Sequence, residues 1–128
     1  CIIVFSLDST KSLKAAKSWI DSVNSMRAEG KHIQIVLVAN KADLPADQIE
    51  FTDWESEGKK LAADSSDEKY GRVPFFDTSA KTGTNIEEMF LSMATMIDSA
   101  REKKSTAATE TTGDGPKPSK GGGCCIVS

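Results

Sequence analysis

Short apolar segments alternate along the chain with longer amphipathic ones, and this alternation constrains the fold more than any other feature of the sequence. The apolar segments comprise residues 1–7, 33–39 and 73–78. In the first two, apolar and polar residues do not alternate, which is typical of strands buried on both faces of a parallel sheet. We therefore predict three strands, of which at least the first two are buried on both faces.

The intervening segments have the residue spacing of amphipathic helices. The predicted helices comprise residues 9–29, 54–63 and 85–101. Burial is expected in the first helix at Leu13, Ala16, Trp19, Ile20, Val23 and Met26, and in the last at Ile86, Met89, Phe90, Met93, Ile97 and Ala100.

Residues at the helix ends support these boundaries. Gly30 is suited to end the first helix, since glycine tolerates the left-handed conformation found there. Thr52 or Asp53 is the expected N-cap of the second helix. Asn85 is expected to cap the third through its side chain, with Glu88 three residues later as its reciprocal partner.

Strands and helices in alternation predict an α/β fold with a parallel sheet over residues 1–101. Residues 102–123 are small, polar and rich in Gly and Pro, which predicts a flexible linker, and residues 124–128 form a separate terminus. The sequence begins with Cys1 inside an apolar segment and has no initial Met. We therefore expect it to be the C-terminal fragment of a longer protein.

Charge and cysteine usage exclude several functions. Residues 101–128 carry five basic and three acidic side chains, so within a total of -3 the rest of the chain holds -5. An acidic body argues against a nucleic-acid partner. The cysteines, Cys1, Cys124 and Cys125, and the single histidine lack the spacing of a zinc site or a disulfide framework. We expect a cytoplasmic, reducing environment.

Polar clusters follow the second and third apolar segments directly. The sequence NKAD occupies residues 40–43, and TSAK occupies residues 78–81. Open parallel sheets bind their ligands beyond the carboxyl ends of the strands. If these strands are neighbours, both clusters lie at the same edge and can contact one ligand.

The residue types at this edge fit a guanine base. The carboxylate of Asp43 can accept two adjacent N–H donors, which guanine presents and adenine does not. Asn40 can donate to guanine acceptors and brace the opposite loop. A free backbone N–H at Ala80 can meet the guanine oxygen, and the alkyl stems of Lys41 and Lys81 can cover the two faces of the base.

NKAD and TSAK resemble the N-K-x-D and S-A-K motifs of Ras-superfamily small GTPases. VFSLDSTKSL and TSAKTGTNIEEMF are similar to sequences of the Rab branch, and the resemblance covers residues 1–100. It implies the C-terminal half of a P-loop NTPase (Ras-like) fold, with a guanine-binding set of Asn40, Lys41, Asp43, Ser79, Ala80 and Lys81.

The resemblance further implies that the intact protein binds GTP and GDP with Mg²⁺ and hydrolyses GTP slowly. It would act in vesicle-mediated traffic on the cytosolic face of endomembranes. Its partners would be a prenyltransferase and escort protein, a GDP-dissociation inhibitor, an exchange factor, a GTPase-activating protein and effectors. The printed sequence contains no P-loop motif, DxxG motif or effector-switch threonine, so we assign it no catalytic residue and no metal ligand.

The sequence departs from the Rab pattern in two further places. Ala39 stands where many Rab proteins have Gly, and the segment AADSSDEKYGRVP, residues 62–74, is longer than the usual connection into the last strand.

The chain ends in GGGCCIVS. A Rab-type terminus would carry geranylgeranyl groups on Cys124 and Cys125. A C-a-a-X terminus ending in Ser would carry farnesyl on Cys125, with palmitate on Cys124 as a second anchor. One lipid alone binds membranes marginally, and only Lys117 and Lys120 lie nearby as basic residues, which favours two lipids.

Two other functions stay open at this point. One is a lipid-anchored α/β interaction module without nucleotide turnover, in which residues 40–43 form an ordinary turn rich in Asn and Asp. The other is a farnesylated, Ras-like signalling GTPase.

Overall fold

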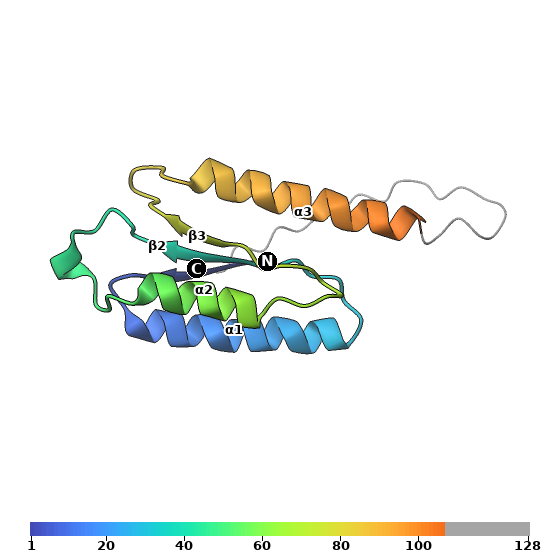
Figure 1. The fold of residues 1–128 in the computed structure, drawn as a ribbon, viewed down its shortest axis with the longest axis horizontal. Coiled ribbons are helices and arrows are strands. Elements are labelled where there is room, and N and C mark those ends of the chain that lie inside the picture. Colours follow the sequence, from blue (N-terminus) through green and yellow to red (C-terminus); the bar gives the residue numbers. More distant parts are fainter. Residues whose placement is uncertain (107–128) are drawn as a thin grey trace.

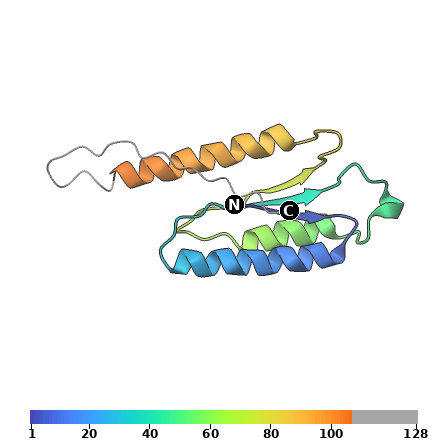
Figure 2. The ribbon, with the colours of Figure 1, turned by 180° about the vertical axis from the view of Figure 1, so that it is seen from behind.

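A computed structural model describes residues 1–106 of the chain. Within them, β1 (Ile2–Ser6), β2 (Val36–Asn40) and β3 (Phe75–Thr78) form a parallel sheet in the order β1-β2-β3. The predicted parallel α/β architecture is confirmed. All three strands run toward the same end of the molecule, where the loops that follow them gather (Figures 1 and 2).

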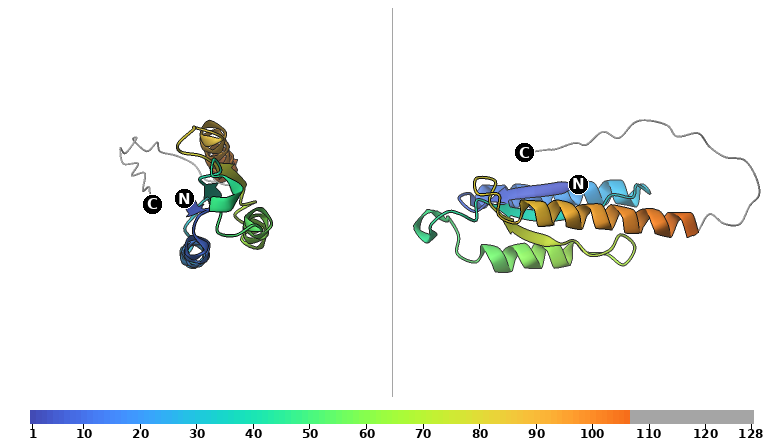
Figure 3. Two further views of the ribbon diagram at one scale, coloured as in Figure 1. Left: turned by 90° about the vertical axis from the view of Figure 1, so that its left-hand side faces the viewer. Right: turned by 90° about the horizontal axis from the view of Figure 1, so that it is seen from above.

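The helices lie on both sides of this sheet. α1 (Thr10–Ala28) and α2 (Trp54–Asp64) lie on one face, and α3 (Ile86–Thr106) lies on the other (Figure 3). A short 3-10 helix, η1 (Ala46–Gln48), interrupts the connection between β2 and α2. None of the helices in residues 1–106 is long and apolar enough to cross a membrane.

The end of α3 differs from the prediction. It extends to Thr106, so the predicted boundary at residue 101 falls inside the helix. The rest of the predicted linker, and the predicted lipidation terminus at residues 124–128, lie outside the described residues.

β2 is the centre of the core. Leu37 and Ala39 belong to the apolar cluster beneath α1 and α2, whereas Val36 and Val38 pack with Met89 of α3. All four strand residues are at most 2% exposed. β2 is therefore buried on both faces, as its composition predicts.

Some apolar positions expected to be buried are exposed. Val4 of β1 is 42% exposed, so β1 is fully buried on one face only, and on the other face Ile2 packs partly buried against the methionine cluster of α3. Phe90 and Ile97 of α3 are also exposed, at 53% and 43%. Trp19 is 55% exposed because it is turned by about 100° from Ile20, which lies in the buried stripe of α1.

Of the residues predicted to end or cap the helices, Gly30 has the predicted role. Gly30 follows α1 with a φ of 90°, and its N–H donates to Arg27 O at 2.9 Å, as in a glycine-terminated helix. Asp53 occupies the N-cap of α2 without a side-chain cap hydrogen bond. The expected capping role of Asn85 is wrong: it has a φ of 57°, and its Nδ2 donates to Asp77 O at 2.8 Å, back toward β3.

Candidate functional site

The loops after β2 and β3 are joined by hydrogen bonds, and we call residues 40–43 and 79–81 the strand-end rim. The strand register pairs Asn40 with Thr78, and just beyond it the Ala42 N–H donates to Thr78 O at 2.9 Å. Asn40 Oδ1 accepts the Ala80 N–H at 3.1 Å. The bracing role predicted for Asn40 is confirmed. The expectation of a free Ala80 N–H is wrong, because the register places the Asn40 amide opposite this loop.

Asp43 and Ser79 form a second link across the rim. Ser79 is 1% exposed, and its Oγ donates to Asp43 Oδ1 at 2.5 Å while accepting the Thr82 N–H at 3.1 Å. The Ser79 hydrogen bond lowers the pKa of the Asp43 carboxyl, and the charges of Lys81 and Lys41 lower it further. Asp43 is therefore an exposed, ionised carboxylate at neutral pH, held in place by a buried hydroxyl.

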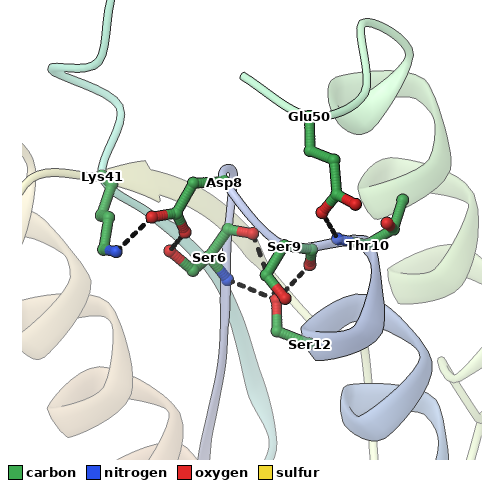
Figure 4. Close-up of polar contacts among 7 residues, drawn as sticks. All are labelled: Ser6, Asp8, Ser9, Thr10, Ser12, Lys41 and Glu50. Atoms are coloured by element: carbon green, nitrogen blue, oxygen red, sulfur yellow. Dashed lines mark hydrogen bonds and ion pairs between the residues drawn. The ribbon is translucent and has the colours of Figure 1, made fainter. Parts of the chain in front are cut away.

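The two lysines of the rim differ in their surroundings. Lys81 is exposed, in the loop after β3. Lys41 has a φ of 70°, which is uncommon for a residue other than glycine, and its Nζ contacts Asp8 Oδ2 at 2.5 Å. This contact adds the loop after β1 to the site (Figure 4).

Sequence reasoning missed Asp8. Its Oδ1 accepts the Ser6 hydroxyl at 2.5 Å, and the hydrogen bonds from Lys41 and Ser6 lower its pKa. One sequence signal could have found it, because Asp8 directly follows the first apolar segment and so lies at the same edge of the sheet.

One nearby and one distant side chain, Ser12 and Glu50, fix the turn that holds Asp8 (Figure 4). Glu50 Oε2 accepts the Thr10 N–H at the start of α1 at 2.5 Å, and the Glu50 N–H donates to Leu7 O at 3.0 Å. Hydrogen bonds from Thr10 lower the pKa of Glu50. Ser12 Oγ accepts the Ser6 N–H at 2.8 Å. No sequence spacing predicts a helix cap supplied from forty residues away.

All six predicted base-contacting residues thus lie at one edge of the sheet, Asn40 at the end of β2 and the others in the loops after β2 and β3. Within residues 1–106, no group of three or more His, Cys, Asp and Glu side chains is arranged to hold a metal ion. Cys124 and Cys125 lie outside the described residues.

A sequence profile of the Ras family matches residues 1–99. The chain belongs to the Ras family. It is 31% identical over 107 residues to GTP-binding protein YPTM2 of Zea mays, covering 84% of this chain and 47% of that protein. It is 28% identical over 134 residues to Ras-related protein Rab-7b of Paramecium octaurelia, covering 98% and 60%.

A third relative is Ras-related protein Rab-27B of Homo sapiens, 36% identical over 97 residues that cover 76% of this chain and 38% of that protein. The predicted resemblance to Rab-like members of the Ras superfamily, and the Ras-like fold, are confirmed. This Ras-family chain spans about half the length of the curated relatives it matches.

The Ser79–Asp43 link gives a first test. Ser79→Ala should raise the pKa of Asp43 toward its usual value, measurable by carboxyl ¹³C NMR across a pH titration. The native pKa of Asp43 is lowered, so its stabilising contribution is present above the unfolded pKa and is lost as pH falls through the native pKa. On acidification through that range, the free energy of unfolding should therefore fall less in Ser79→Ala than in the native protein.

Thr84→Val is the matched control, because Thr84 lies in the same loop and its hydroxyl contacts Thr82 rather than Asp43. An Asp43 pKa that stays unchanged in Ser79→Ala would contradict the assigned hydrogen bond.

Proposed function

We propose that the strand-end rim binds the base of a guanine nucleotide. The observation that carries the proposal is the pairing of Asp43 with Ser79, which presents an ionised carboxylate on the same rim as the Asn40 amide. An ionised carboxylate only accepts hydrogen bonds, and guanine offers two neighbouring N–H donors on one edge. Adenine offers an acceptor there and would leave the carboxylate unpaired, which strongly disfavours binding.

The other residues of the rim support the same ligand. The Asn40 brace holds the two loops at a fixed separation. The alkyl stems of Lys41 and Lys81 would lie on opposite faces of the base, since lysine stems pack on apolar surfaces while their ammonium groups stay in water. Because Ala80 N–H is bound to Asn40, the guanine oxygen is assigned to the Asn40 amide group as donor.

We infer that the whole protein is a GTP/GDP-dependent switch that hydrolyses GTP in the presence of Mg²⁺. Membership of the Ras family supports this role, and no residue of the printed chain is assigned to catalysis or to the metal. The relatives named Rab support a place in vesicle-mediated membrane traffic. The proposed partners are a GDP-dissociation inhibitor, an exchange factor, a GTPase-activating protein, effectors, and the prenyltransferase with its escort.

Replacing Asp43 tests the base assignment. In the full-length protein, Asp43→Asn should reduce the preference for GDP over XDP by about 10²-fold or more, measured by competition binding. The Asn amide supplies a donor for the xanthine oxygen that replaces the guanine amine, whereas the native carboxylate repels that oxygen.

Asp47→Asn is the control, because Asp47 is an exposed acid in the same connection between β2 and α2. If the Asp43 variant keeps the native preference for GDP, Asp43 does not read the base.

The proposed membrane anchor gives a separate prediction. Mass spectrometry of the C-terminal peptide, from protein made in cells that carry the lipid-modifying enzymes, should show geranylgeranyl groups on both Cys124 and Cys125. Two lipids are expected because one chain anchors only marginally. Cys124→Ser should retain one lipid and shift protein from the membrane to the soluble fraction. A single farnesyl group on Cys125 would contradict this assignment.

A further inference from the structure

Asp8 has no part in the base recognition described above, yet it contacts the rim directly. It lies in the turn between β1 and α1, one residue beyond Leu7, whose N–H donates to Asn40 O at 3.1 Å. That hydrogen bond places the turn beside the first residue of the rim. From there Asp8 Oδ2 contacts the Nζ of Lys41 at 2.5 Å (Figure 4).

The carboxylate of Asp8 is oriented by a hydrogen bond besides the one from Lys41. Its second oxygen accepts the Ser6 hydroxyl, so each oxygen has a donor from a different element. The backbone of the turn is fixed on one side by Ser12, which accepts the Ser6 N–H, and on the other by Glu50, which accepts the Thr10 N–H. The Asp8 carboxylate is therefore held in one position by the surrounding hydrogen bonds.

The contribution of this ion pair to folding is small. The side chains of Lys41 and Asp8 are 48% and 38% exposed, and ion pairs this open to water contribute little to stability. The backbone of Lys41 is nevertheless held at a positive φ. Unfavourable backbone conformations gather at binding sites, where the surrounding structure maintains them. A ligand-positioning role explains both observations.

We propose that Asp8 is a positioning residue for the nucleotide site, anchoring the Lys41 ammonium at the β1 side of the rim so that its alkyl stem is ordered along one face of the base. The inference rests on the proposed guanine-binding function. A free lysine side chain has many rotamers, and ordering it on binding costs entropy. Asp8 imposes that order beforehand, so the bound nucleotide is held longer.

The test is the dissociation rate of fluorescently labelled GDP from the full-length protein. Asp8→Asn should release the nucleotide about two- to fivefold faster at low salt, the effect expected for one exposed ion pair. The difference from the native protein should shrink at about 1 M salt, where exposed charges are screened. Glu55→Gln is the matched control, since Glu55 forms an exposed ion pair with Lys59 on α2.

A double-mutant cycle separates positioning from a general structural effect. Lys41→Met keeps the length of the stem and removes the ammonium, so Asp8→Asn should have no further effect on dissociation in that background. If Asp8→Asn accelerates release equally with Lys41 or Met at that position, Asp8 does not act through Lys41 and the inference is overturned.

The remaining outcomes distinguish this inference from the proposed function. A native protein that binds GDP, with the same release rate in Asp8→Asn, overturns the role of Asp8 alone. A native protein that binds no guanine nucleotide overturns the proposed function and this inference together.

Discussion

The pairing of β2 with both of its neighbours is the constraint on which the site depends. Parallel strands that pair in register end at the same level, so the residues that follow them meet at one edge. Here the backbone pairing continues past the strands, through Leu7 N–H to Asn40 O and Ala42 N–H to Thr78 O. A shift of register would break these hydrogen bonds and separate Asn40 from its partner Thr78, so the alignment of the three loops depends on this pairing.

Each loop at this edge is fixed to the next by a side chain. Asp8 contacts Lys41 across the first pair of loops, and Asn40 accepts from Ala80 across the second. The buried hydroxyl of Ser79 orients Asp43 in the same way. Such links order the contacting groups before a ligand arrives, which reduces the entropy lost on binding.

Local sequence rules accounted for the features that depend on local structure. The parallel sheet, the glycine end of α1 at Gly30, and the meeting of the NKAD and TSAK loops all follow from periodicity and from the geometry of strand ends. The misses depend on tertiary contacts. Glu50 caps a helix forty residues away, and Asn85 bonds back to β3 rather than capping α3. The exposure of Val4 and Phe90 depends on where α3 lies on the sheet, which amphipathic spacing does not encode.

The most direct measurement is a crystal structure of the full-length protein with bound GDP. We predict both guanine N–H groups at hydrogen-bond distance from Asp43, and the base between the stems of Lys41 and Lys81. The Ser79–Asp43 and Asp8–Lys41 contacts should persist in the complex. A base bound elsewhere, or bound with Asp43 turned to solvent, would contradict the claim that the strand-end rim reads guanine.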